Sequence, residues 1–236
     1  MSLSSVPRVL VLFDVDHTLI ETRGVGREMY ERIFPVVIGV PFRKLAAVSG
    51  RTELDIIRET LELHGIDPTG EAVSRLAASL VKGYEAARDE LAERGRVLPG
   101  ARESLERLGA DDGIYLGVLT GNLRGVARIK LEVFGLDGYL DLEASAYGDD
   151  DPQRSELVAI AQRRATEQTS VVFDDRCTVL IGDTPKDVEA ALTAGVRVIG
   201  VASGKSSMDD LRAAGATQVL ADLVDPVAVV RAVVEA

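Results

Sequence analysis

The sequence predicts an α/β fold with a parallel sheet and an inserted all-helical segment. Residues 9–13 form an uninterrupted apolar run, which is typical of a strand buried on both faces of a parallel sheet. Later apolar runs alternate with helical patterns, as they do in βαβ units. Residues 22–98 differ, because their apolar residues recur only at helical spacing. With 236 residues, the chain is long enough for a core domain and a smaller second one.

The remaining elements follow in order from apolar runs and helical periodicity. Strands are expected at 115–119, 139–146, 178–181 and 197–201, with a late apolar piece at 217–220. Helices are expected at 101–108, 123–133, 155–164, 185–194 and 226–234. Pro99 and Gly100 mark the point where the chain returns to the core. We therefore expect a discontinuous core domain of residues 1–21 and 99–236, and a helical domain of residues 22–98 over the crevice where open α/β sheets bind ligands.

The composition argues against several classes of partner. The 38 acidic residues outnumber the 27 basic ones and give a formal charge of −11, so we expect no nucleic-acid partner, which would need a basic face. No apolar stretch approaches the roughly 18 residues of a membrane span, so no membrane partner is expected either. The single cysteine, Cys177, cannot form an internal disulfide, which indicates a reducing, cytoplasmic location. A monomer and a homodimer are both compatible with this composition.

Two aspartates, Asp14 and Asp16, directly follow the first apolar run. Side chains two residues apart on an extended chain point to the same side, so both carboxylates are expected at the carboxyl end of a core strand. A calcium-binding EF-hand loop is excluded, because its sixth position would be Leu19 instead of Gly and its twelfth Val25 instead of Glu. For this stretch alone, a plain turn is the alternative.

Polar residues also follow two further strands of the predicted core. After one strand come Thr120, Gly121 and Asn122, whose hydroxyl and turn amides can bind an oxyanion; alternatively, Asn122 only caps the next helix. Asp183 and Asp187 follow another strand. Asp187 can instead close a capping box at the start of its helix, but this does not account for Asp183.

Together these strand ends would gather Asp14, Asp16, Asp183 and Asp187 at one edge of the sheet. Carboxylates that lie so close repel one another and need a hard cation. Mg²⁺ prefers carboxylate oxygens and usually shares its coordination shell with a substrate phosphate. The sequence therefore predicts Mg²⁺ as the cofactor, with one carboxylate attacking a phosphoryl group.

These motifs resemble those of the haloacid dehalogenase superfamily of phosphohydrolases, and the match spans nearly the whole chain. The first family motif, D-x-D-x-T, matches residues 14–18, the second, a strand ending in Thr or Ser, matches Thr120, and the fourth, G-D-x-x-x-D, matches residues 182–187. The helical insertion resembles the small α-helical cap of phosphoglycolate phosphatases and β-phosphoglucomutases. The resemblance implies a Rossmann-like sheet of order 5-4-1-2-3, in which the strands ending at Asp183, Asp14 and Thr120 are neighbours.

The resemblance also implies a role for each matching residue. Asp14 would be the nucleophile and a metal ligand. Asp16 would be the general acid and then the base, with its main-chain carbonyl on the metal. Asp183 would bind Mg²⁺ directly, or with Asp187 through water. Thr120 would donate a hydrogen bond to the transferring phosphate.

The third family motif is a departure. The family normally places a lysine before the helix that precedes the fourth motif, but residues 132–185 contain none. The basic candidates are Arg154, Arg163, Arg164 and Arg176. We predict Arg154, because it lies at a helix start and its guanidinium can bridge a carboxylate and a phosphate oxygen. The alternative is that Arg154 only pairs with the neighbouring acids at 149–151.

Three further residues are candidates for substrate specificity. His17 stands where the family usually has Gly, and its side chain either contacts the cap or points to solvent. Arg51 and Thr52 begin a predicted cap helix, with Thr52 as its N-cap. Arg51 either binds a carboxylate or hydroxyl of the leaving group or is a solvated surface residue.

The predicted function is a Mg²⁺-dependent phosphatase that hydrolyses a small phosphorylated metabolite, similar to phosphoglycolate or a sugar phosphate, through an aspartyl-phosphate. A phosphomutase of the same family is the alternative, since it carries the same motifs. A receiver-type signalling domain also has a phosphate-accepting aspartate, but Asp16 and the large helical insertion argue against it. A dehalogenase is disfavoured, because in this family that chemistry goes with loss of the second aspartate.

Overall fold

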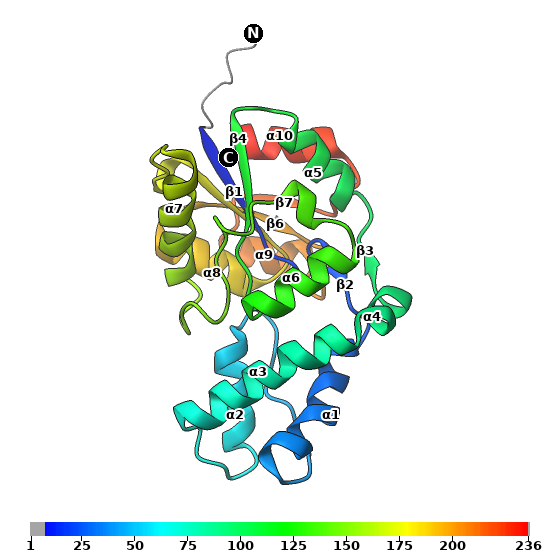
Figure 1. Ribbon diagram of the computed structural model, residues 1–236. Coiled ribbons are helices and arrows are strands. Elements are labelled where there is room, and N and C mark those ends of the chain that lie inside the picture. Colours follow the sequence, from blue (N-terminus) through cyan, green and yellow to red (C-terminus); the bar gives the residue numbers. More distant parts are fainter. Residues whose placement is uncertain (1–7, 236) are drawn as a thin grey trace.

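The computed structural model describes residues 8–235 and contains a parallel sheet covered by helices, with a group of helices at one end of it (Figure 1). The sheet has five strands in the order β4-β1-β5-β6-β7, and every neighbouring pair is parallel. Its strands are β1 Val9–Phe13, β4 Ile114–Val118, β5 Thr178–Gly182, β6 Arg197–Val201 and β7 Gln218–Leu220. The predicted Rossmann-like α/β class is confirmed.

Helices cover both faces of the sheet, which is why its strands read as continuous apolar runs. Leu10 and Leu12 of β1 pack on one face with α7, α8 and α9, and Val11 and Phe13 pack on the other with α5 and α10. The helices that follow the sheet strands are α5 Ala101–Gly109, α6 Arg124–Val133, α7 Glu156–Thr169, α8 Pro185–Ala194, α9 Met208–Ala213 and α10 Pro226–Glu235. The two-residue alternation along β1 thus divides the core into two layers.

The predicted strand at 139–146 is wrong. The segment starts at the end of a 3₁₀ turn, η1 (Asp137–Tyr139), and only Ala146 pairs with the sheet, through a single bridge. The Asp141 carboxylate accepts hydrogen bonds from the backbone two and three residues later, at 2.9 and 3.0 Å, so the chain turns locally instead of extending. The implied order 5-4-1-2-3 therefore holds for β6-β5-β1-β4, its outermost strand is reduced to that bridge, and β7 extends the opposite edge.

Four helices lie between β1 and α5, at the end of the sheet where β1 stops (Figure 1). They are α1 Val25–Ile38, α2 Glu53–Glu62, α3 Gly70–Ala86 and α4 Arg88–Arg94. Helix α3 packs against both α1 and α2, and on its other side against α6. The strands β2 (Ile20–Glu21) and β3 (Arg96–Val97) form a short antiparallel ladder, which pairs the chain just before the inserted helices with the chain just after them. The division into domains 1–21 with 99–236 and 22–98 stays a prediction, and residues 1–7 lie outside the described part.

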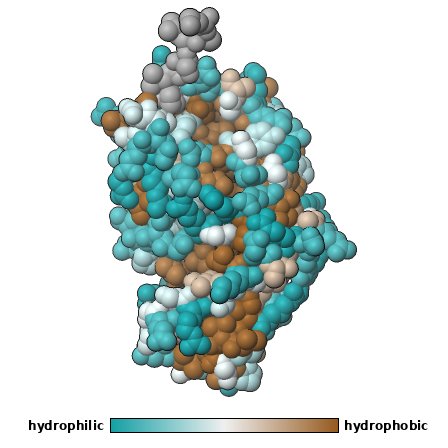
Figure 2. All heavy atoms as spheres, in the orientation of Figure 1, coloured by the Kyte–Doolittle hydropathy of each residue, from teal (hydrophilic) through white to brown (hydrophobic). Residues whose placement is uncertain are grey.

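The surface of the helical end is partly apolar. Figure 2 shows hydrophobic atoms gathered over the face of the α1–α3 group. An open hollow of about 650 Å³ is lined by Arg27, Glu31 and Pro35 of α1 and by residues 39–43, and none of the predicted site residues lines it. Within residues 8–235, the helices are too short or too polar to cross a membrane.

Candidate active site

The polar residues that follow β1, β4 and β5 lie together, because these strands are parallel neighbours and end at the same edge of the sheet. Asp14 follows β1, Thr120 lies just beyond β4, and Asp183 follows β5. All three are buried, with exposed fractions of 7%, 0% and 3%. The sheet therefore positions the three motif residues next to one another, as the sequence predicts.

The start of α8 brings Asp187 to the same place. Thr184 is the N-cap, and its hydroxyl accepts a hydrogen bond from the backbone N–H of Asp187 at 3.2 Å. In return, Oδ2 of Asp187 accepts from the backbone N–H of Thr184 at 3.0 Å and from its hydroxyl at 2.7 Å. Only one carboxylate oxygen is used by this capping box, so Oδ1 is directed elsewhere. Asp187 therefore closes the capping box of α8 and also lies beside Asp14 and Asp183, and its role as a metal ligand stays a prediction.

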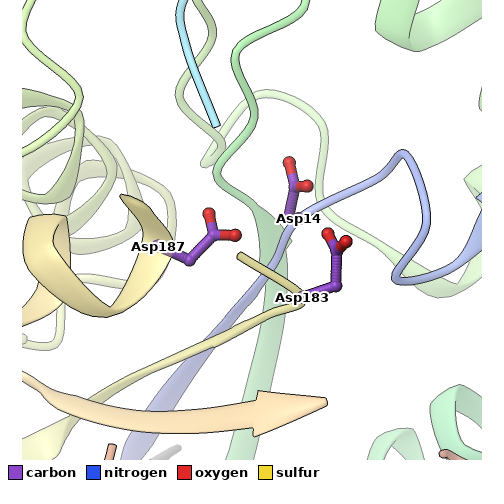
Figure 3. Close-up of side chains that lie close together, drawn as sticks. All are labelled: Asp14, Asp183 and Asp187. Atoms are coloured by element: carbon purple, nitrogen blue, oxygen red, sulfur yellow. The ribbon is translucent and has the colours of Figure 1, made fainter. Parts of the chain in front are cut away.

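Asp14, Asp183 and Asp187 form a compact carboxylate cluster (Figure 3), in which each offers an oxygen within 4.8 Å of the others. Burial raises the pKa of Asp14 to about 6; Arg154 opposes this shift, and repulsion from Asp187 adds to it. Burial also raises the pKa of Asp183 to about 8, and repulsion from Asp14 and Asp187 contributes. Without a cation, the cluster therefore holds protons near neutral pH.

Arg154 lies against this cluster, in the turn before α7. Its Nη2 atom is 3.0 Å from Oδ1 of Asp14 and 2.6 Å from Oδ1 of Asp187, and 8% of its side chain is exposed. Burial works against the charge, but Asp187 and Asp14 hold the pKa of Arg154 above its ordinary value. The acid at 150 instead pairs with Arg164. The structure thus places Arg154 beside the predicted nucleophile and away from the surface acids.

The cluster fits a hard divalent cation. Nε of Arg154 is buried without a hydrogen-bond partner among the described residues, and Nη2 of Arg154 and Oδ1 of Asp187 face each other at 2.6 Å as an ion pair without hydrogen-bond alignment. Polar capacity of this kind needs a ligand to satisfy it. The three carboxylates supply only oxygen atoms, which is the donor set of Mg²⁺. The guanidinium at the rim of the cluster adds a site for an anion.

A second buried cation, Lys130, contacts Asp16 and was not predicted. Nζ of Lys130, on α6, donates to Oδ2 of Asp16 at 2.6 Å and to Oδ1 of Asn122 at 2.7 Å. Burial alone would raise the pKa of Asp16, but the charge and hydrogen bonds of Lys130, with the amide of Asn122, lower it overall. The signal was a lysine on the apolar face of its helix: Val126 and Phe134, four residues before and after it, are both buried.

The sequence as a whole was compared with known proteins. A model of the family described as haloacid dehalogenase-like hydrolase matches residues 11–201. The chain belongs to this family. A protein named "Probable phosphatase IndB" from Dickeya dadantii is 29% identical over 210 residues, covering 87% of this chain and 86% of that protein. A plasmid-encoded phosphoglycolate phosphatase from Cupriavidus necator is 28% identical over 222 residues, covering 92% and 90%.

Among solved structures, one titled "Putative beta-phosphoglucomutase from Bacteroides vulgatus" has a TM-score of 0.68 at 18% identity. The match covers 98% of this chain and 90% of that one. At this identity the likeness shows the fold alone. The shared fold therefore extends over the sheet and the inserted helices together.

Position 17 is the place where the first motif departs from the glycine that the family resemblance implies. His17 has a φ of 62°, in the left-handed region that Gly occupies without strain. Its carbonyl accepts a hydrogen bond from the hydroxyl of Ser203 at 2.6 Å. The main chain at His17 thus keeps the conformation of a glycine turn while carrying a half-buried side chain.

The predicted phosphate loop contacts the inserted helices. The carbonyl of Gly121 accepts from the backbone N–H of Glu53 at 2.7 Å. A Cβ at position 121 would lie 2.0 Å from the carbonyl oxygen of Arg51, so only glycine fits. Asn122 does not cap α6, because the N-cap of this helix is Leu123. The side-chain amide of Asn122 instead donates to Asp16 at 2.7 Å and to the hydroxyl of Thr120 at 2.8 Å.

Arg51 and Thr52 lie at the start of α2, as predicted, but with different contacts. The expected capping hydrogen bond of Thr52 is absent among the described residues; its hydroxyl donates to the carbonyl of Pro152 at 3.1 Å. The guanidinium of Arg51 binds Asp55 at 2.6 Å and also pairs with Glu59, both on α2. Whether Arg51 acts in specificity stays a prediction.

Proposed function

We propose that this chain is a Mg²⁺-dependent phosphatase of a small phosphorylated metabolite, working through an aspartyl-phosphate on Asp14. One observation carries the proposal: Asp14 lies between a fixed guanidinium and two further buried carboxylates. A phosphate group needs such a cation beside an attacking carboxylate, because the two anions would otherwise repel each other. Family membership and two curated relatives named as phosphatases support hydrolysis of a phosphate ester.

In the first half of the proposed reaction, a carboxylate oxygen of Asp14 attacks phosphorus. The bond between Asp14 and phosphorus forms, and the bond from phosphorus to the leaving-group oxygen breaks. Asp16 gives its proton to that oxygen, while Arg154 and the hydroxyl of Thr120 bind the phosphoryl oxygens. In the second half, water attacks phosphorus, Asp16 takes the proton of the water, and the bond to Asp14 breaks to release inorganic phosphate.

Mg²⁺ would be held by the carboxylates of Asp14, Asp183 and Asp187 and by the main-chain carbonyl of Asp16. When bound, it supplies positive charge that neutralises these carboxylates and the substrate phosphate. The lowered pKa of Asp16 favours its carboxylate form, which accepts the proton from water in the second half, and the first half proceeds from the minority of chains in which Asp16 carries a proton.

The proposed substrates are small esters similar to phosphoglycolate or a sugar phosphate. One relative is named a phosphoglycolate phosphatase. The inserted helices α1–α4 lie at the carboxyl edge of the sheet, where they can act as a cap over a small substrate. The single cysteine supports a cytoplasmic site of action. A phosphomutase is the second candidate, because the same residues would serve it, and its products separate it from a phosphatase.

The test measures phosphate release from a panel of phosphate monoesters, with Mg²⁺ and with a chelator. The wild type should release free phosphate only with Mg²⁺, and Asp14→Asn should lose nearly all turnover while its circular dichroism spectrum is unchanged. The matched control is Asp112→Asn, an exposed aspartate before the opposite end of β4. Substantial turnover by folded Asp14→Asn would overturn the proposal, and an isomeric sugar phosphate without free phosphate would identify a mutase.

A further inference from the structure

Burying the charged side chain of Lys130 costs the fold free energy. Its side chain is only 4% exposed, on a helix face whose other members are apolar. Removing an ammonium group from water costs several kcal/mol. Replacing a buried ion pair with well-packed apolar residues therefore often leaves a protein equally stable or more stable. Stability alone therefore does not account for a lysine here, and its contacts indicate another use.

Those contacts converge on one atom of Asp16. Nζ of Lys130 donates to Oδ2 at 2.6 Å, and Nδ2 of Asn122 donates to the same Oδ2 at 2.7 Å. Lys130 also donates to Oδ1 of Asn122 at 2.7 Å, which fixes which way the amide faces. Three side chains thus form a closed triangle of hydrogen bonds. Both hydrogen bonds to the Asp16 carboxylate end on Oδ2, and 31% of the Asp16 side chain is exposed.

The triangle is held from the inserted helices as well. Nζ of Lys130 lies 5.4 Å from the ring centre of Tyr84 on α3, within the range of a cation–π contact. Tyr84 is 5% exposed and is a core residue of its helix. Lys130 is therefore confined between Asp16 on one side and α3 on the other. Its place is distinct from that of Arg154, which contacts Asp14 and Asp187.

We propose that Lys130, together with Asn122, is a positioning residue that anchors the Asp16 carboxylate through Oδ2 and presents Oδ1 to the leaving-group oxygen. This rests on the proposed function, in which Asp16 is the acid that protonates that oxygen. Proton transfer from a positioned group is worth about 10²- to 10⁴-fold, and it depends on geometry held to a fraction of an ångström. Loss of the anchor should therefore remove part of that factor.

The experiment compares kcat/KM for an alkyl phosphate and for 4-nitrophenyl phosphate, because only the alkoxide needs a proton as it leaves. Lys130→Met, which keeps the volume and removes the donors, should lower kcat/KM about 10- to 100-fold for the alkyl ester and much less for the aryl ester. Lys130→Arg, which keeps a donor, should recover part of the loss. The matched control is Lys82→Met, at an exposed lysine of α3, which should change neither value.

If Lys130 had a purely structural role, Lys130→Met would lower kcat/KM equally for both substrates, and that result would overturn the proposal. In an Asp16→Ala background, Lys130→Met should have no further leaving-group effect; full additivity would likewise refute it. If Lys130→Met does not fold, Asn122→Ala replaces it, because this change leaves Lys130 paired with Asp16. If Asp16→Ala itself affects both esters equally, the acid role fails, and the anchoring role fails with it.

Discussion

Adding Mg²⁺ to the metal-free protein at pH 7 should release about one proton per chain. With pKa values of about 8 and about 6, Asp183 is about nine-tenths protonated at this pH and Asp14 about one-tenth. A metal ligand has to be ionised, so these protons leave when the ion binds. The number should rise to about two at pH 5 and fall to about 0.1 at pH 9. Because the carboxylates titrate as one cluster, the total does not depend on how the protons divide between them.

Isothermal titration calorimetry at a fixed pH, in two buffers with different enthalpies of ionisation, measures this number directly. The observed heat should differ between the buffers in proportion to the protons released. Asp112→Asn should give the wild-type value, since this aspartate is exposed and outside the cluster. Heats that are the same in both buffers at pH 7 would show that the carboxylates are already ionised, and the reasoning from burial would be refuted.

The same shifts fix how stability changes with pH without Mg²⁺. Both pKa values are raised above their ordinary 3.8, so the folded chain binds more protons than the unfolded chain between about pH 4 and pH 8. The free energy of unfolding of the metal-free protein should therefore decrease as the pH rises from about 4 to about 8. A fixed concentration of Mg²⁺ should raise the melting temperature more at pH 8 than at pH 5.5.

Substitutions at three positions test other parts of the protein. Arg154→Ala should reduce phosphate release about 10²- to 10³-fold, Arg154→Lys should restore part of it, and a normal rate for Arg154→Ala would place the cation elsewhere. Arg51→Ala should raise KM for the best substrate and spare 4-nitrophenyl phosphate; identical kinetics on both would leave Arg51 with a structural role in α2. Asp150→Asn removes a bidentate contact to Arg164 and should lower the free energy of unfolding by about 1–2 kcal/mol at pH 7. Since the pKa of Asp150 is lowered in the fold, that difference should shrink as the pH of urea unfolding falls below 3.8, and a difference that stays constant from pH 7 to pH 3 would contradict it.

Strand ends were the part of the site that sequence could predict well. An apolar run followed by an aspartate fixes both the strand and the edge at which the side chain emerges, as for Asp14 and Asp183. Arg154 could also be predicted, because only a few cations lie in the interval where one was needed. Its partner atoms could not, since they depend on how the turn before α7 is folded.

The errors have local physical causes. The alternating apolar residues at 139–146 indicate a strand, but the side chain of Asp141 competes for the backbone hydrogen bonds and turns the chain. Lys130 was missed because a lysine in a helix is normally taken as exposed, and only its position on the apolar face of α6 marks it. The hydrogen-bond partners of Lys130, Asn122 and Asp16, are 8 and 114 positions away in the sequence, so no local pattern reveals them.

The β2–β3 ladder makes the inserted segment exchangeable. Ile20 pairs with Val97 and Glu21 with Arg96, so the chain leaves the sheet region and returns to it at adjacent points. Paired strands lie about 4.8 Å apart, a gap that a short turn can close. Residues 22–95 could therefore be replaced by a shorter or longer segment without moving β1 or α5. If the inserted segment closes over the site as proposed, a chain with a different segment at this point would admit a different substrate while the carboxylates and Arg154 stay in place.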